Sequence, residues 1–569
     1  MHHEFSQRKV LGTRQRLGNH VAAPLAATAF MFCAIPAAAG PAVPGCPGLI
    51  GLPLPNTTIT LAQSYAAGAI VSGNTRAPVD LCRVAATIKP GPQSNVRMEV
   101  WIPTDGSWNG KYQQVGNGGF AGSISAGNIA NAVSRGYATA GTDDGTSGPP
   151  SGAPAFVGNP DVLLDYGYRA VKATADNSKA IVTALMGQAP SYSYFVGCSD
   201  GGREALQEAQ RYPNDFDGII AGSPVNDQVG EFGAAYLYNM QATLSGPQTG
   251  GVPDAYIPAS KLPVLTNAVL ARCVGKDGGV AGDLFLNDPR QCKFDPSMVQ
   301  CTAGQDPTTC LTPPQVEAAK KLYAGPKDHT TLLFPGMEPG SEAPAGGWQS
   351  WITGASSATP GAQFGLGFGF TCSLVHDQTT CDYLSNDVVA QDNVARATLQ
   401  PILSSVNPDL SGFKARGGKL IQYAGWSDAA IPPQNGLNYY RKVTKVMGDT
   451  SDFYRVFMAP GMGHCSGGAG LNAFGNGTSN GPVIDADHDL VKALERWVEQ
   501  GTAPTHIIAT HYVNNAAAQG VDFQRPLCPF PQRAEYVGQG DPKSAASFAC
   551  VTRPDFFDLH NLNVQRAYQ

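Results

Sequence analysis

The 569-residue sequence is poor in charged residues. Asp, Glu, Lys and Arg together make up 14% of the chain, and the formal net charge is −6. Nucleic-acid-binding proteins carry basic patches or stripes, and none is visible here. Hydrophobic residues reach 42%, with 67 glycines and 44 prolines, which indicates a globular chain with long structured loops. We therefore expect no nucleic-acid partner.

Long hydrophobic runs are absent beyond the N-terminal region. The stretch VAAPLAATAFMFCAIPAAAG, residues 21–40, follows four basic residues between positions 8 and 16 and ends in small residues, as an export signal does. Two prolines interrupt it, so a retained membrane anchor is the weaker alternative. We predict a signal peptide over residues 1–39 and a secreted or periplasmic mature protein with no membrane segment.

No CxxC pair occurs among the 13 cysteines, which disfavours a zinc site. Cys33 lies in the predicted signal, and removing it leaves 12 cysteines. An even number in an exported chain is typical of disulfides formed in an oxidising compartment. We predict six disulfides, whose partners cannot be deduced from spacing alone.

The order of apolar and helix-like segments indicates an α/β fold. Apolar runs alternate with helical stretches from about residue 96 to 221, and the same order returns after about residue 405. Between them the chain is rich in loops and cysteines. Because 569 residues exceed what one core usually supports, we predict two hydrolase-type segments, 40–225 and 406–569, separated by an inserted lid, 226–405.

Three residues suggest nucleophilic catalysis. Ser199 lies in GCSDG, residues 197–201, between a strand-like and a helix-like run, and so fits the G-x-S-x-G nucleophile elbow; an ordinary turn is the alternative. Asp428 and His464 each follow a later predicted strand, in the order that an α/β-hydrolase requires. His464 would take the serine proton, and Asp428 would hold its tautomer. Asp143 and Asp144 precede the serine and suggest a structural turn.

A cysteine adjoins both the serine and the histidine. Cys198 directly precedes Ser199, and Cys465 directly follows His464. A disulfide between them would tether the two loops. The alternatives are a purely structural staple and a thiol nucleophile at Cys198, which the even cysteine count disfavours.

The segments GCSDGGRE, GWSDAAIPP and GMGHCSGG resemble the tannase and feruloyl esterase family of α/β-hydrolases, which includes mono(2-hydroxyethyl) terephthalate hydrolase. The resemblance spans the chain from Cys46 to Cys550. It implies an α/β-hydrolase domain with a large lid, and hydrolysis of small aromatic acid esters through an acyl-enzyme without a catalytic cofactor. It also implies the Cys198–Cys465 disulfide and an oxyanion hole made by the amides of Asp200 and Gly118, the latter in VGNGGF.

The resemblance further implies most of the remaining disulfides and a structural calcium site in the lid. The calcium loop of the family, C-D-x-x-D-G-x-x-D-G, corresponds here to CVGKDGGVAGDLFLND. Val274 replaces the first carboxylate, so binding should be weaker; Asp277, Asp283 and the Gly279 carbonyl are the candidate ligands. The implied pairs are Cys46–Cys82, Cys273–Cys292, Cys301–Cys310 and Cys528–Cys550, which leaves Cys372 with Cys381.

Several substrate classes remain open. Esters of phenolic acids, feruloyl or galloyl, are the leading expectation, with aromatic lid residues forming the acyl pocket. A terephthalate monoester hydrolase would need a lid arginine, and none occurs between 290 and 396, unless Arg396 or Lys327 substitutes. A peptidase would share the triad, whereas a non-catalytic binding protein would not need it intact. The aromatic candidates are Trp348, Trp351, Phe364, Phe368 and Phe370.

Overall fold

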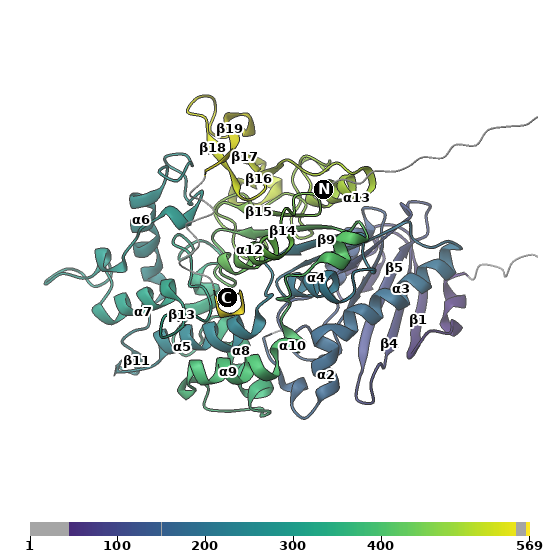
Figure 1. Ribbon diagram of the computed structural model, residues 1–569, viewed down its shortest axis with the longest axis horizontal. Coiled ribbons are helices and arrows are strands. Elements are labelled where there is room, and N and C mark those ends of the chain that lie inside the picture. The colour runs from purple at the N-terminus through teal and green to yellow at the C-terminus, as the bar shows by residue number, and fades with distance from the viewer. Residues whose placement is uncertain (1–44, 150, 554–564, 569) are drawn as a thin grey trace, which may run out of the picture. The chain divides into compact units, whose positions relative to one another are not determined.

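A mixed nine-stranded sheet forms the centre of the computed structural model (Figure 1), in the order β1-β4-β5-β7-β6-β8-β9-β14-β15. The strands from β7 to β15 in this order are parallel, whereas β1, β4 and β5 pair antiparallel at the other end. The structure describes residues 45–149, 151–553 and 565–568, all within one compact unit that begins at Val43. The predicted signal peptide, residues 1–39, lies outside the described residues.

The strands of this sheet and of the small two-stranded sheets have the following bounds. They are β1 Thr57–Tyr65, β2 Ile70–Ser72, β3 Thr75–Arg76, β4 Leu81–Ile88, β5 Val96–Pro103, β6 Lys111–Val115, β7 Ala138–Thr142, β8 Tyr192–Cys198, β9 Gly218–Gly222, β10 Gln248–Thr249, β11 Val252–Pro253, β12 Lys327–Asp328, β13 Thr331–Leu332, β14 Lys419–Gly425, β15 Tyr454–Ala459, β16 Ile507–Tyr512, β17 Val521–Leu527, β18 Gln532–Tyr536 and β19 Phe548–Thr552.

The α-helices connect and cover these strands. They are α1 Ala126–Val133, α2 Pro160–Leu164, α3 Ala170–Met186, α4 Asp200–Arg211, α5 Tyr236–Leu244, α6 Leu262–Cys273, α7 Pro313–Ala324, α8 Ala362–Gly369, α9 Val388–Thr398, α10 Gln400–Leu403, α11 Ser411–Ala415, α12 Gln434–Met447 and α13 Leu490–Gln500.

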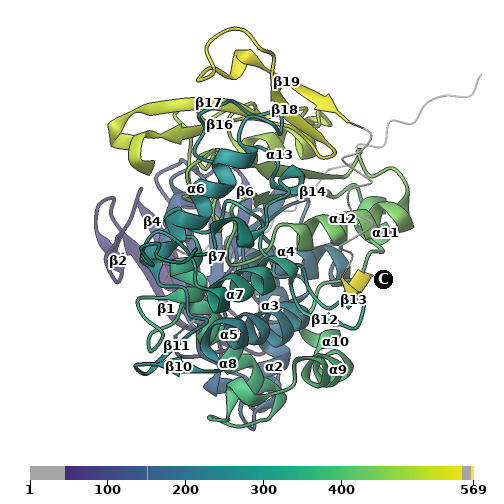
Figure 2. The ribbon, with the colours of Figure 1, turned by 90° about the vertical axis from the view of Figure 1, so that its left-hand side faces the viewer.

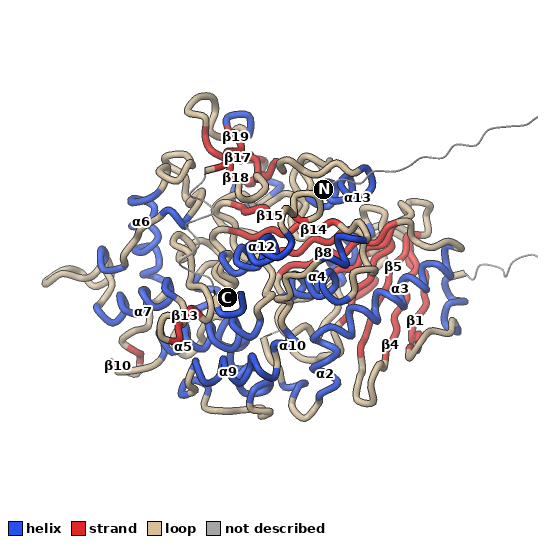
Figure 3. Tube along the Cα trace, in the orientation of Figure 1, coloured by secondary structure: helices blue, strands red, loops and turns tan. Residues whose placement is uncertain are grey.

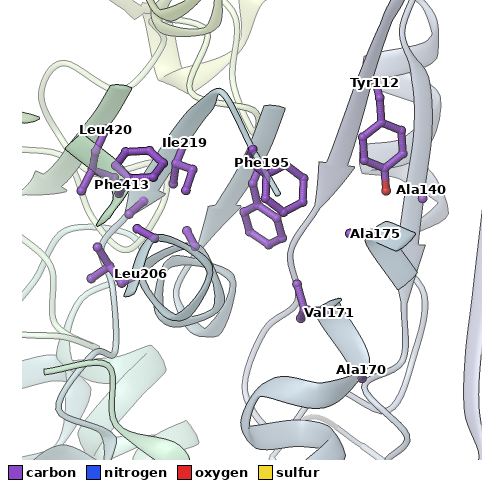
Figure 4. Packing of buried hydrophobic residues seen from close by; sticks show 14 of the residues in the cluster. Tyr112, Ala140, Ala170, Val171, Ala175, Phe195, Leu206, Ile219, Phe413 and Leu420 are labelled. Carbon is purple, nitrogen blue, oxygen red and sulfur yellow. The ribbon is translucent and has the colours of Figure 1, made fainter. Parts of the chain in front are cut away.

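The central parallel strands are buried on both faces, which explains their nearly continuous apolar sequences. On one face Phe195 of β8 packs in the same core as Leu206 of α4 and Ile219 of β9 (Figure 4). On the other face Tyr194 and Val196 pack in a core that includes α13. Helices on both faces of a parallel sheet bury it fully. The predicted α/β fold is confirmed.

The chain leaves the sheet after β9 and returns in β14, although these two strands are paired neighbours. The intervening stretch is mostly helix and loop, with the short pairs β10–β11 and β12–β13 (Figure 3). Its helices α5, α6 and α7 face the viewer in Figure 2. This stretch contains the predicted lid, 226–405, and its boundaries stay a prediction. Of the helices in the described part of the chain, none combines the length and apolar character needed to span a bilayer.

Six disulfides join the twelve cysteines of the described residues, with the partners that the family resemblance implies. They are Cys46–Cys82, Cys198–Cys465, Cys273–Cys292, Cys301–Cys310, Cys372–Cys381 and Cys528–Cys550.

Candidate active site

Ser199 occupies a sharp turn between β8 and α4. Its backbone φ is 68°, a left-handed conformation that a non-glycine residue rarely adopts. Close packing of the glycines makes the turn possible, because a Cβ on Gly197 would lie 2.3 Å from the Gly201 carbonyl oxygen. The Ser199 N–H donates to the carbonyl of Gly222, at the end of β9, over 3.0 Å. The sequence therefore folds locally as an elbow that lifts one serine above the sheet edge.

Asp428 and His464 meet at the same edge of the sheet. Asp428 follows β14 and His464 follows β15, and the ends of these parallel strands are in register with each other. The Nδ1 atom of His464 lies 2.9 Å from Oδ2 of Asp428. Asp428 is fully buried, and its Oδ1 accepts the amides of Ala430 and Ile431, both at 2.9 Å. With its proton on Nδ1, His464 has Nε2 free to accept a proton.

The disulfide between Cys198 and Cys465 joins the serine loop to the histidine loop. The two Cα atoms are 6.0 Å apart, although 267 positions separate them in the sequence. Two side chains fix the backbone at Cys465: Asn476 Nδ2 and Thr478 Oγ1 donate to its carbonyl over 3.1 and 2.8 Å. The disulfide thus links the serine loop to the histidine loop, and the hydrogen bonds hold the histidine loop against residues 476–478.

The glycine-rich loop after β6 lies against the N-terminus of α4. The Gly201 amide donates to the Asn117 carbonyl over 2.8 Å, and the Tyr166 hydroxyl lies 2.9 Å from the Gly119 carbonyl oxygen. Among the described residues, neither the Gly118 nor the Asp200 amide donates to another protein group. Both N–H groups are therefore available to a ligand at the serine.

Two cavities adjoin Ser199 and His464. The larger, of about 440 Å³, has walls of mixed polarity, whose polar side chains include Ser123, Asn128, Asn131 and Thr478. The smaller, of about 150 Å³, is apolar, and its walls are Gly119, Ser151, Ser199, Phe232, Tyr236, Trp351, Ala362, Leu366, Ala430, Ile431 and His464. The site therefore offers an apolar side and a side of mixed polarity to a substrate whose reacting atom lies at the serine.

Trp351 is the one aromatic residue of the five predicted for the acyl pocket that lines these cavities. Its ring centroid lies 4.9 Å from that of His464, edge to face. Trp348 and Phe370 are fully buried elsewhere, and Phe364 and Phe368 pack around Tyr383. The aromatic walls that sequence reasoning missed, Phe232 and Tyr236, come from the stretch just after β9. The available signal was the mostly apolar run VGEFGAAY, residues 229–236.

The cations proposed as substitutes for a lid arginine lie away from both cavities. Arg396 forms ion pairs with Asp227 and Asp392, and Lys327 is exposed on β12. In the described part of the chain no Arg or Lys lines either cavity. A carboxylate on the substrate would therefore meet no Arg or Lys of the described residues in either cavity.

The residues expected to bind calcium do not fit the ion. Asp277 Oδ2 accepts the amides of Asn287 and Asp288, at 2.6 and 3.0 Å, and its Oδ1 accepts that of Gly279 at 3.2 Å. Both oxygens of Asp283 accept from Arg525, each at 2.7 Å.

Arg525 is 4% exposed, and its guanidinium lies 4.8–5.4 Å from the ring centroids of Phe285, Phe523 and Phe548. Calcium takes six to eight oxygen ligands, whereas a buried guanidinium already neutralises the Asp283 carboxylate. We therefore do not retain the calcium prediction.

The sheet order, the covering helices and the serine elbow define an α/β-hydrolase, and comparison with known proteins identifies its family. The family model described as tannase and feruloyl esterase matches residues 82–551. An uncharacterized esterase of Xanthomonas campestris pv. campestris is 39% identical, with 90% of this chain and 91% of that protein covered. A probable feruloyl esterase B-2 of Aspergillus terreus is 30% identical, over 87% and 90%.

A solved structure of similar fold supports the same assignment. The crystal structure of feruloyl esterase B from Aspergillus oryzae matches with a TM-score of 0.81 and 27% identity, covering 89% of this chain and 99% of that one. The chain belongs to the tannase and feruloyl esterase family, and it is a carboxylic ester hydrolase.

Proposed function

We propose that this protein is an exported serine esterase that hydrolyses esters of phenolic acids, of the feruloyl or galloyl type. The observation that carries the proposal is the apolar cavity beside Ser199 and His464. Its aromatic and aliphatic walls suit a planar acyl group, and no Asp, Glu, Lys or Arg of the described residues lines it. The names of the relatives point to the same acyl group.

The geometry suits a two-step acyl transfer. His464 Nε2 takes the Ser199 proton as Oγ attacks the ester carbonyl, and Asp428 stabilises the imidazolium through Nδ1. The Gly118 and Asp200 amides stabilise the tetrahedral oxyanion. His464 then protonates the leaving alcohol, and the acyl group remains on Ser199. A water, deprotonated by His464, attacks the acyl-enzyme and releases the acid.

A terephthalate monoester is the less favoured substrate. Its free carboxylate would enter an apolar cavity that no Arg or Lys of the described residues lines, and burying an unpaired charge is costly. Arg396 is already paired with Asp227 and Asp392, so it does not offer its charge to a substrate carboxylate, which supports this ranking. A binding protein without activity is disfavoured by the intact triad and by the esterase relatives.

Export is proposed on two grounds. The N-terminal residues have the pattern of a signal peptide, and six disulfides are typical of an oxidising compartment. The lid assignment of residues 226–405 belongs to the same proposal, because this stretch supplies Phe232, Tyr236, Trp351 and Leu366 to the cavity.

The test compares kcat/KM of the purified protein on methyl ferulate, methyl gallate and a terephthalate monoester, with Ser199→Ala as the blank. We expect one of the phenolic esters to exceed the terephthalate monoester by about tenfold or more, which corresponds to about 1.4 kcal/mol of transition-state binding. The reverse ranking would reject the proposed substrate class, and hydrolysis of all three by Ser199→Ala would reject the mechanism.

A further inference from the structure

A pair of buried carboxyl groups lies directly behind the glycine-rich loop. Asp144 follows β7 and is fully buried, and Glu204 of α4 is 1% exposed. Carboxylate oxygens of these two residues and of Asp200 lie within 4.8 Å of one another. Two ionised carboxylates at this distance in a low-dielectric interior would repel each other strongly.

No cation of the described residues forms an ion pair with Asp144 or Glu204, although the positive charge of nearby Arg203 lowers the pKa of both. Arg203 is engaged by Asp200, with Nε 2.5 Å from Oδ1. Asp143, the neighbour of Asp144, is ion-paired with Arg97.

The side-chain amide of Asn117 faces Asp144 and lowers its pKa, but this amide donates to the Thr142 carbonyl, and no described group donates a well-aligned hydrogen bond to either oxygen of Asp144 or to Oε1 of Glu204. Tyr166, the remaining titratable group nearby, has its hydroxyl 2.9 Å from Asp200. A proton shared between the two carboxyl groups would satisfy these oxygens and remove one charge.

The other oxygen of Glu204 contacts the loop that holds the proposed oxyanion donor. Oε2 accepts the Asn117 amide over 3.2 Å, one residue before Gly118. The loop lies so close to α4 that a Cβ on Gly116 would be 2.8 Å from Oε2 and 2.5 Å from the Gly201 Cα. Through the Asn117 amide, Glu204 therefore supports the neighbouring Gly118 amide, which must be placed within a few tenths of an ångström to stabilise the oxyanion.

We propose that Asp144 and Glu204 share one proton and that this carboxyl pair is a positioning element for the oxyanion loop. Neither residue touches the substrate: Glu204 acts through the Asn117 amide, and Asp144 acts by holding Glu204. The proposal rests on the proposed role of the Gly118 amide. Burial, followed by the neighbouring acidic groups, raises the pKa of Glu204 well above its usual value, and burial raises the pKa of Asp144 to about 7, both consistent with a retained proton.

The pair gives the reaction a specific pH dependence. When the shared proton is lost at alkaline pH, a second negative charge develops behind the amides that stabilise the oxyanion, and kcat should fall. Glu204→Gln cannot lose a proton there. Its Nε2 donates to ionised Asp144, and its Oε1 still accepts the Asn117 amide, so this alkaline fall in kcat should disappear.

The experiment compares pH profiles of kcat and KM for the intact enzyme, Glu204→Gln, Glu204→Ala and the matched control Glu208→Gln. Glu208 lies one turn further along α4 and is also 1% exposed. The acidic group that raises the pKa of Glu208 most is Asp215, and not Asp144. We expect Glu204→Ala to lower kcat by about 10- to 100-fold with little change in KM. Glu204→Gln should retain kcat at neutral pH without the alkaline fall, and Glu208→Gln should keep the profile of the intact enzyme.

Three outcomes would overturn the proposal: an unchanged kcat in Glu204→Ala, an alkaline fall retained in Glu204→Gln, or the same change of profile in Glu208→Gln. If Glu204→Ala does not fold, the profile of Glu204→Gln still decides. All these variants keep Ser199, so their ratios test the pair alone. An active Ser199→Ala protein would instead reject the proposed function.

Discussion

The sheet edge that carries Ser199 and the loop at 273–292 both contain buried carboxylates and a disulfide, but they balance the charge differently. In the 273–292 loop Asp283 is met by the fixed positive charge of Arg525. At the edge, Asp144 and Glu204 have no such partner among the described residues. A permanent ion pair fixes the 273–292 loop, whereas at the edge the buried cation Arg203 is paired with Asp200 and the proposed shared proton limits the charge of Asp144 and Glu204. The comparison predicts that changes at the edge alter rate and that changes in the loop alter stability.

The largest effect on rate is expected from the triad. Ser199→Ala, His464→Ala and Asp428→Ala should each lower kcat by about 10³-fold or more, and a double variant should lose little beyond the worse single one because the residues act as a unit. Thermal unfolding should change by only a few degrees. A Ser199→Ala protein with substantial activity, or multiplicative losses, would contradict the assignment.

A smaller loss of rate should follow removal of the Cys198–Cys465 link. Replacing both cysteines with Ala frees the two loops, and a displacement of about 1 Å between reacting groups can cost about a hundredfold. Stability should also fall, by up to about 5 kcal/mol in the loop-entropy model. The matched control replaces Cys528 and Cys550, whose disulfide does not adjoin the serine or the histidine. This control should lower stability but keep kcat within about twofold of the value for the unchanged enzyme. Equal losses of kcat in the two variants would contradict the prediction that the Cys198–Cys465 disulfide supports the reaction rate more than the Cys528–Cys550 disulfide does.

The loop at 273–292 should respond in stability alone. Arg525→Gln leaves Asp283 buried without its partner, which costs about 3–5 kcal/mol in comparable pairs, so Tm should fall by several degrees while kcat of the folded enzyme changes little. The double replacement Asp283→Leu with Arg525→Met should cost less than Arg525→Gln alone. A chelator should leave Tm unchanged. A fall in Tm on chelation, reversed by calcium, would show that an ion binds after all.

The smallest effect concerns the pH dependence of stability. The folded-state pKa of Asp144 is raised from 3.8 to about 7, chiefly by burial. The contribution of protonated Asp144 to the free energy of unfolding is therefore fully present below about pH 4 and is lost as pH rises through about 7. Asp144→Asn has no proton to lose. The Tm of Asp144→Asn relative to the unchanged protein should therefore rise by a few degrees between pH 4 and pH 8. A difference that is flat, or that has the opposite sign, would contradict this account.

The strand pattern was sufficient to bring the proposed triad, Ser199, Asp428 and His464, to one edge of the sheet, because the carboxyl ends of parallel strands meet at one edge wherever the strands occur in sequence. The acyl pocket could not be predicted in the same way. Trp348, Trp351 and Phe370 are all aromatic residues of the same loop-rich segment, so the sequence does not distinguish them. Only the packing of the stretch between β9 and β14 decides which ring lies beside the serine. Glu204 was hidden in REALQEAQR, where it reads as an ordinary helix former, because the sequence does not show that α4 is covered on nearly all sides. Arg525 was missed because it lies far along the chain from Asp283.

The Cys198–Cys465 link also turns the chain between residues 199 and 464 into a covalently closed ring. A single cut by a protease anywhere in that ring, including its long exposed loops, would leave both ends attached. For an enzyme proposed to work outside the cytoplasm among foreign proteases, a nick in the ring would not by itself separate the serine from the histidine, so long as the disulfide stays oxidised. Reducing conditions would remove that protection, which makes resistance to clipping a property of the compartment as well as of the fold.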